Sequence, residues 1–241
     1  MYMKSKNKLI VILFLVFLVV CRCSNSVEGF EKNIDDLTFS KTQKWGKFEW
    51  SAADNLNRTN QNILRNLPII PFPKNSSYQT KTELSDIVKK RKELNEKHMK
   101  QIVAEREWKN TIKQFGVKVD EEKRLDNYIF QKVQPIHLTI KRHFDRVRPS
   151  FLDKKIVPVI RIPAHGAYPS GHSTEAWSLA FCLSDKYPER KNKYYAIANN
   201  IATNRERAGL HYKSDSDYGK LLARKILDLV GSENHPLLGK Y

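Results

Sequence analysis

The stretch Ala167–Trp177 has the sequence AYPSGHSTEAW and marks a change from an irregular segment to a helix. Pro169 fixes one backbone dihedral angle, and Gly171 leaves another free. Because Ser170 is a favourable N-cap, these residues predict a tight turn that opens a helix. The free backbone N–H groups at such a helix start favour an anion, and His172 in the first turn could transfer a proton to it. Architecture alone does not require a histidine at this place.

Periodic apolar residues predict further helices on both sides of this turn. The predicted helical segments are 81–115, 121–144, 172–184, 191–207 and 217–230. Residues 155–162 are the best candidate for a strand. Residues 67–73 (LPIIPFP) predict an extended strap across the core, because proline interrupts regular structure. We therefore expect a mainly α fold with a single helical core at residues 81–241, preceded by an N-terminal extension at residues 27–80 that contains the strap.

The first 26 residues differ from the rest of the chain. Lys4, Lys6 and Lys8 precede an apolar run at residues 9–20, which is short for a membrane span. A basic head followed by such a run is typical of a secretory signal peptide, and an uncleaved N-terminal anchor is the alternative. Residues 1–26 therefore predict an exported protein that is periplasmic, secreted or held at the membrane through this segment.

The chain is strongly basic, with a formal net charge of +17. Four of these charges lie within residues 1–26, which contain no acidic residue, so the remainder still carries about +13. Such a charge fits nucleic acid, an anionic membrane surface or small phosphorylated molecules, and it does not choose among them. The charges of residues 81–115 nearly balance, which favours a solvated helix face there over a nucleic-acid patch. Outside the first 26 residues Cys182 is the only cysteine, which excludes an intramolecular disulfide and a cysteine zinc cluster in that part.

Three short clusters carry residues suited to phosphate chemistry. They are KRHFDRVRP at residues 141–149, PSGH at residues 169–172 and RERAGLHYKSD at residues 205–215. Each alone has an ordinary explanation: a solvated helix face, a helix start and a structural hydrogen bond, respectively. Together they supply three cations, two histidines and a carboxylate, which suffice to move a phosphoryl group without a metal. These residues are Lys141, Arg148, Arg205, His172, His211 and Asp215.

In this order and spacing the clusters resemble the three-part signature of the type 2 phosphatidic acid phosphatase (PAP2) superfamily, K-x6-R-P, P-S-G-H and S-R-x5-H-x3-D. More loosely, the strap and the basic helix after it resemble soluble bacterial class A acid phosphatases. The superfamily also includes vanadium haloperoxidases. One position departs from the signature, because Asn204 stands where the family has serine. Asparagine can still donate a hydrogen bond to an oxyanion, so we expect tuned activity there and no loss of activity.

The resemblance implies a helical bundle of the acid phosphatase and haloperoxidase type and a role for each matching residue. His211 would be the nucleophile that forms a phosphohistidine, Asp215 would orient it, and His172 would protonate the leaving alkoxide. The phosphate would be held by Lys141, Arg148, Ser170, Gly171 and Arg205. No metal and no cofactor is implied, so we expect activity to survive EDTA.

These roles require a neutral His211 and a protonated His172. We therefore expect a bell-shaped pH profile with its maximum on the acidic side of neutrality, provided that nearby charges raise the pKa of His172 more than that of His211. His165 lies near the PSGH turn, and we expect a surface or structural role for it. Tyr168 is expected to pack in the core. The remaining histidines match no position of the signature; they are His98, His137, His143 and His235.

The leading hypothesis is an exported, metal-independent phosphatase with an acidic pH optimum and broad specificity for phosphate monoesters. Its alternatives are a phosphatase of lipid phosphates or pyrophosphates at a membrane surface, a vanadate-dependent haloperoxidase, and a non-catalytic phosphate binder. The haloperoxidases are generally longer, and a binder has no need of both histidines and the carboxylate. The partners expected are a small phosphorylated substrate or a lipid phosphate at the membrane surface, with no specific nucleic acid. A homo-oligomer stays open.

Overall fold

A computed structural model describes residues 33–54 and 56–239 of the chain. The predicted signal peptide or anchor at residues 1–26 lies outside these residues. The chain forms two compact units, and the described part of the first is a short 3₁₀ turn, Ile34–Asp36. The second unit, Leu37–Tyr241, contains both the strap and the helical core.

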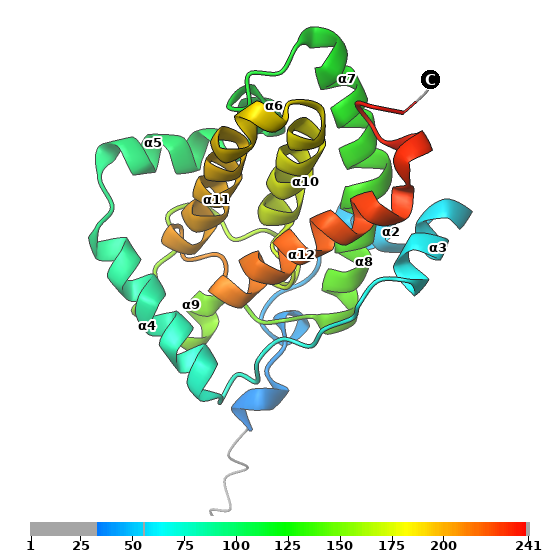
Figure 1. Cartoon of the computed structure of the whole chain (residues 1–241). Helices are drawn as coiled ribbons and strands as arrows, with labels where there is room; N and C mark the ends of the chain where they lie inside the picture. Colours follow the sequence, from blue (N-terminus) through cyan, green and yellow to red (C-terminus); the bar gives the residue numbers. More distant parts are fainter. Residues whose placement is uncertain (1–32, 55, 240–241) are drawn as a thin grey trace, which may run out of the picture. The chain divides into compact units, whose positions relative to one another are not determined.

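The second unit is built of helices, shown in Figure 1. They are α2 (Lys47–Asp54), α3 (Arg58–Arg65), α4 (Tyr78–Lys92), α5 (Glu96–Ala104), α6 (Trp108–Lys113), α7 (Val119–Tyr128), α8 (Gln134–Phe144), α9 (Pro149–Leu152), α10 (Gly171–Lys186), α11 (Lys191–Arg207) and α12 (Lys213–Val230). Over the described ranges the helices are joined by no strand, and the extended pairing there is an isolated bridge between Thr38 and Arg146. The mainly α class expected from the sequence is confirmed.

The strand expected at residues 155–162 is wrong, since the structure has irregular backbone there. Ile156, Ile160 and Ile162 pack inward and Val157 is exposed, while the Val159 N–H donates to the Ala208 carbonyl at 3.0 Å without forming a strand. Ile156 is buried in a small cluster with Tyr212, and Ile160 packs against Leu210 in another. A short period-two pattern therefore reflected one-sided burial of a loop.

Helix α10 lies at the centre of the core. It packs against α11 and α12, which flank it in Figure 1. Its residues are buried on nearly every side, including Leu179, Ala180 and Leu183, because small and apolar side chains let the neighbouring helices approach closely. The PSGH turn at its start is thereby fixed inside the protein.

Two predicted helical segments have a finer structure than expected. Segment 81–115 is divided among α4, α5 and α6, and Asn95 begins α5 by accepting a hydrogen bond from the His98 N–H at 3.0 Å. Segment 121–144 is helical throughout but contains a π-helical turn, η3 (Ile129–Val133). Pro135 has no N–H to bond the carbonyl of Gln131, which instead accepts from the Asn60 amide at 2.8 Å.

The extended strap is confirmed, with residues 68–74 free of regular structure. Its carbonyls accept hydrogen bonds from two core tyrosines, at 2.8 Å from Tyr168 to Ile70 and at 2.8 Å from Tyr218 to Pro68. Tyr168 stacks on Tyr218 with ring centroids 4.7 Å apart, which confirms its packing role. The strap thus covers the face of α12 and of the turn that precedes α10.

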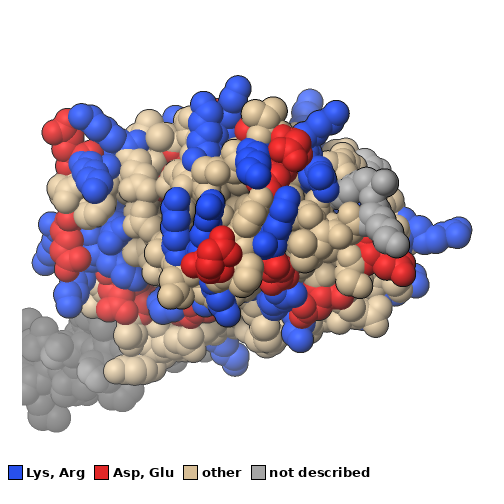
Figure 2. Space-filling view, turned by 45° about the horizontal axis from the view of Figure 1, so that its top comes forward, with Lys and Arg blue, Asp and Glu red and all other residues tan. Residues whose placement is uncertain are grey.

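Charged residues of both signs are mixed over one face of the protein (Figure 2). Figure 2 shows Lys and Arg interspersed with Asp and Glu over the face drawn, with no single basic patch. Across the part of the chain that was described, no helix is both long enough and apolar enough to cross a membrane.

Candidate active site

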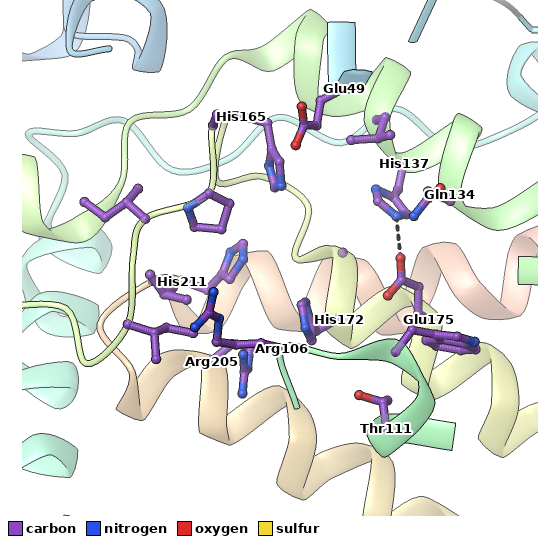
Figure 3. A pocket seen from close by; sticks show the side chains of 18 of the residues that line it. Glu49, Arg106, Thr111, Gln134, His137, His165, His172, Glu175, Arg205 and His211 are labelled. Atoms are coloured by element: carbon purple, nitrogen blue, oxygen red, sulfur yellow. Dashed lines mark hydrogen bonds and ion pairs between the residues drawn. The ribbon is translucent and has the colours of Figure 1, made fainter. Parts of the chain in front are cut away.

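The second and third sequence clusters line one cavity of about 530 Å³, and Arg148 of the first cluster lies behind its wall against His211. Helices α8, α10 and α11 contribute its walls together with the loop before α10 and the loop between α11 and α12. The titratable residues of its interior are seen in Figure 3 and include His137, His165, His172, Glu175, Arg205 and His211. Four residues of the predicted site, His172, Gly171, Arg205 and His211, line this cavity directly. Lys141, Arg148, Ser170 and Asp215 are buried immediately behind them.

His211 is held by a carboxylate on its own stretch of chain. Its Nδ1 lies 3.0 Å from Oδ2 of Asp215, which also accepts from the Tyr212 N–H at 3.0 Å at the start of α12. The other oxygen of Asp215 accepts from Arg146 at 2.6 Å. Asp215 and Arg146 are both fully buried, so each offsets the burial cost of the other's charge. The ring of His211 is therefore fixed by a rigid chain of partners.

The hydrogen bonds of His211 also define its tautomer. Nη1 of Arg148 lies 2.9 Å from Nε2 of His211, and a guanidinium can only donate. Nε2 of His211 is therefore the acceptor, and Nδ1 carries the proton that is donated to Asp215. Burial, together with the charges of Arg148 and Lys141, holds the pKa of His211 well below its usual value. A neutral ring with its lone pair on Nε2 is the form that a nucleophile needs.

Lys141 shapes the turn that precedes α10. Its ammonium donates to the carbonyls of Gly166 at 3.0 Å and Ala167 at 3.2 Å, and also to that of Pro169. Ser170 is the N-cap of α10, with Oγ accepting from the Ser173 N–H at 3.4 Å. The PSGH segment is thus a helix start stabilised by a buried cation.

Gly171 leaves room for a second histidine. A Cβ at this position would lie 3.1 Å from Cε1 of His137, which is closer than nearly all real Cβ contacts. His137 lies on α8, one turn before Lys141, and its ring therefore packs against the first residue of α10. Glycine keeps this wall of the cavity close to the turn.

His172 is oriented by the backbone at the end of α5. Its Nε2 lies 2.9 Å from the carbonyl oxygen of Glu105, which can only accept, so Nε2 carries a proton. Burial and the charge of Arg205 lower the pKa of His172 to about 4. In the protein alone, nearby charges therefore do not raise the pKa of His172, because burial and the charge of Arg205 outweigh the opposing effect of Glu175, and the pKa of His211 is lowered as well.

Glu105 connects α5 to the third cluster. Its Oε2 accepts from Arg205 at 2.6 Å, and its Oε1 accepts from the Asn204 amide at 2.9 Å. The oxygen of Asn204 in turn accepts from Arg207 at 3.0 Å. Asn204 is fully buried and bonds this carboxylate in place of the oxyanion that we expected.

Two buried cations are left with carbonyl and imidazole partners. Neither Lys141 nor Arg148 forms an ion pair among residues 33–54 and 56–239, and both have no exposed surface. Burial lowers the pKa of Arg148 to about 10, and burial with the charge of Arg148 lowers that of Lys141. Buried cations without counter-charges favour a bound anion at the cavity.

His165 belongs to the cavity rather than to the surface. Its Nδ1 lies 3.1 Å from Nη2 of Arg148, whose Nη2 also donates to the His165 carbonyl at 2.9 Å. Burial and the charges of Lys141 and Arg148 hold the pKa of His165 well below its usual value. It therefore fixes the guanidinium that faces His211.

Sequence reasoning missed four residues that hold or line the site: Glu105, Arg146, His137 and Glu175. Two of them had a usable signal. Arg146 precedes Arg148 by two residues in the first cluster, and Glu175 is one helical turn after His172 and hence on the same face. Glu105 had none, because its partners lie about a hundred residues away. Within the described part of the chain no group of three or more His, Cys, Asp or Glu side chains could hold a metal ion.

Comparisons with known proteins support this assembly. Residues 128–227 match the model of the PAP2 superfamily. The chain is 32% identical over 63 residues to a non-specific acid phosphatase of Providencia stuartii, a match that covers 26% of this chain and 25% of that protein. The chain thus spans about a quarter of the curated relative that it matches.

The fold is similar to a solved structure described as the first bacterial vanadium-dependent iodoperoxidase. The TM-score is 0.55 at 16% identity, and the similarity covers 77% of this chain and 55% of the other. The expected helical fold of the acid phosphatase and haloperoxidase type is therefore confirmed. The match to the PAP2 superfamily model at residues 128–227 contains all three clusters.

Proposed function

We propose that this protein is an exported phosphatase that hydrolyses phosphate monoesters through a phosphohistidine on His211. The observation that carries the proposal is the tautomer of His211, whose Nδ1–H faces Asp215 and whose Nε2 lone pair is directed away from it, toward Arg148. A non-catalytic phosphate binder has no use for a buried, uncharged imidazole among cations. A nucleophile requires one.

In the first step Nε2 of His211 attacks phosphorus, and the bond from phosphorus to the ester oxygen breaks. The leaving alkoxide takes a proton from His172 and departs as an alcohol. Asp215 stabilises the positive charge that His211 gains. In the second step water attacks phosphorus, gives a proton to His172, and the P–N bond breaks to release phosphate and the neutral His211.

Substrate binding would favour the protonated form of His172, which the charges of the protein disfavour. A phosphate dianion beside His172 favours the cationic ring and raises its pKa from about 4, since opposite charges stabilise each other. Arg148 would move from His211 to a phosphate oxygen, with Arg205 and the Gly171 N–H on the others. The acidic pH optimum that we propose thus depends on the substrate dianion.

The test is phosphate release from p-nitrophenyl phosphate, combined with trapping of the phosphoenzyme. The wild type should release phosphate in EDTA and give a phosphoenzyme that is labile in acid and stable in base. His211→Gln should give neither, whereas His143→Gln, which changes an exposed histidine of α8, should behave as the wild type. Turnover without a trapped phosphohistidine, or turnover in His211→Gln, would refute the mechanism.

Two other functions have distinct outcomes in the same assay. Oxidation of halide by peroxide after addition of vanadate, without phosphate release from any ester, would identify a haloperoxidase. Hydrolysis confined to phosphatidate or a prenyl pyrophosphate in vesicles would identify a lipid phosphatase. Vanadate should inhibit the proposed phosphatase as a mimic of the trigonal transition state.

A further inference from the structure

A second histidine and carboxylate pair lies in the same cavity, outside the three sequence clusters. Nε2 of His137 on α8 lies 3.0 Å from Oε1 of Glu175 on α10. The side chains keep only 4% and 12% of their surface exposed, and both residues line the cavity. Figure 3 shows the Glu175 carboxylate directed into the cavity from the wall that carries His172. The pair is therefore part of the cavity wall.

Glu175 lies beside His172 on the face of α10 that lines the cavity. It follows His172 by three residues on α10, so both side chains project from the same face of the helix. If His172 protonates the ester oxygen, the atoms attached to that oxygen extend from His172 along the cavity wall. Glu175 is the next polar side chain of that helix face in the cavity.

The ionised form of Glu175 is favoured. Burial alone would raise the pKa of Glu175, but the hydrogen bond from His137 and the positive charge of Lys141 lower it below its usual value. His137 has a lowered pKa because of burial, so the pair is a neutral imidazole that donates to a carboxylate. One His137 hydrogen bond leaves Glu175 with further acceptor capacity.

The wall around the pair is mixed in character. Thr111 and Gln134 are labelled near it in Figure 3, and Trp108 and Phe130 line the same cavity with their rings 5.7 Å apart. The lining also includes a second carboxylate, Glu49 on α2, and two exposed cations, Arg106 and Arg161. A leaving group at Glu175 thus meets hydrogen-bonding groups, apolar surface and the carboxylate of Glu175 itself.

We propose that Glu175, positioned by His137, is a specificity residue that selects uncharged leaving groups bearing a hydroxyl and disfavours anionic ones. The inference rests on the proposed function. A hydroxyl near the ester oxygen would donate to the carboxylate, and a charged acceptor makes a stronger hydrogen bond than a neutral one. A carboxylate or phosphate on the leaving group would meet a like charge in a desolvated cavity.

Three esters with three-carbon leaving groups test this selection. n-Propyl phosphate has no hydroxyl on its leaving group, α-glycerophosphate has two, and phosphoglycerate has a carboxylate. The wild type should have its highest kcat/KM for α-glycerophosphate and its lowest for phosphoglycerate. A wild type that hydrolyses phosphoglycerate as well as α-glycerophosphate would overturn the inference without any variant.

Glu175→Gln removes the charge and keeps an oxygen that accepts from His137. Relative to n-propyl phosphate, kcat/KM for α-glycerophosphate should fall about tenfold and that for phosphoglycerate should rise about tenfold. Glu175 also raises the pKa of His172. The loss of this effect in Glu175→Gln is common to the three esters, so it cancels in the ratios of kcat/KM. Unchanged ratios with a uniform loss would show a purely structural or electrostatic role and overturn the inference.

Glu49→Gln is the matched control, because Glu49 on α2 lines the same cavity and loses the same charge. It should leave the ratio of α-glycerophosphate to n-propyl phosphate unchanged, and an equal change in both variants would contradict a specific role for Glu175. If no ester is hydrolysed by the wild type, the proposed function fails separately. Binding of the three esters, measured by calorimetry, then tests selection, and equal affinities in the wild type and Glu175→Gln would refute it.

Discussion

The cavity contains two histidine and carboxylate pairs with the same 3.0 Å spacing and opposite arrangements. In His211–Asp215 the carboxylate takes Nδ1, and the Nε2 lone pair accepts from the buried guanidinium of Arg148. In His137–Glu175 the carboxylate takes Nε2, and Nδ1 is buried without a hydrogen-bond partner. The lone pair that the carboxylate leaves free thus meets a cation in the first pair and no polar partner in the second. The proposed role of His211 depends on this difference in the surroundings of the free nitrogen.

The strongest test of the difference between the two pairs is to replace His211 and His137, one at a time, with glutamine. His211→Gln should lower kcat/KM for p-nitrophenyl phosphate by about 10⁴-fold or more, because no nucleophile remains. His137→Gln should lower it by less than about tenfold, because the glutamine amide can still donate to Glu175. Steady-state kinetics of both variants checks this. Comparable losses would mean that the second pair also takes part in the chemistry.

His172 lies between the two pairs, and its replacement sharpens the comparison. His172→Ala should lower kcat/KM for alkyl phosphates by about 10² to 10³-fold, because an alkoxide leaves poorly without a proton. For p-nitrophenyl phosphate the loss should be much smaller, since nitrophenolate needs little protonation. Parallel assays on both ester types measure the difference. Equal losses would remove His172 from the role of acid.

The histidines of the cavity should also make folding sensitive to acid. The pKa of His172 is about 4 in the folded protein and about 6.5 when unperturbed. Between these values the unfolded chain binds protons that the folded chain does not, so the free energy of unfolding falls as pH falls from about 6.5 to about 4. For His172 alone the fall is up to about 3 kcal/mol, and His137, His165 and His211 act in the same direction.

Urea unfolding at several pH values measures this dependence, with His172→Gln as the comparison. The variant should lose less stability than the wild type over the same interval. Inorganic phosphate should reduce the loss in the wild type, because a bound dianion raises the histidine pKa. Parallel curves for the two proteins would show that His172 is not buried in its neutral form.

The first pair was predictable from the sequence, and the second was not. His211 and Asp215 lie four residues apart within one cluster, so their spacing indicates a contact before any fold is known. His137 and Glu175 are 38 residues apart and meet only because α8 packs on α10. The spacing of residues within either helix does not indicate this contact. The role of Glu105 was missed for the same reason.

The fold was predictable to a similar depth. Long apolar periods located α10, α11 and α12, and the prolines of segment 67–73 located the strap. The strand prediction for segment 155–162 was wrong, because a loop that is buried on one side gives the same alternation of apolar residues as a strand. The division of segment 81–115 depended on caps such as Asn95, whose effect is small beside the helical pattern around it.

The smallest effect should come from Asn204→Ser, which leaves both pairs intact and introduces the serine that the family has at this position. Asn204 spans from Glu105 to Arg207, at 2.9 and 3.0 Å, and a serine is too short to reach both. Glu105 would keep Arg205, so its carbonyl should still orient His172. We expect a loss of about 1 kcal/mol in the free energy of unfolding and a fall in kcat/KM of less than about tenfold.

Urea midpoints and steady-state kinetics of Asn204→Ser measure these two quantities together, and Thr203→Ser, at a half-buried neighbour on α11, is the control for a side-chain change on the same helix. Faster turnover in Asn204→Ser would mean that a serine at this position reaches the phosphate. The bond from Asn204 to Glu105 would then be a feature of stability alone. A loss as large as that of His172→Ala would mean instead that Glu105 positions the acid only while both of its oxygens are bonded.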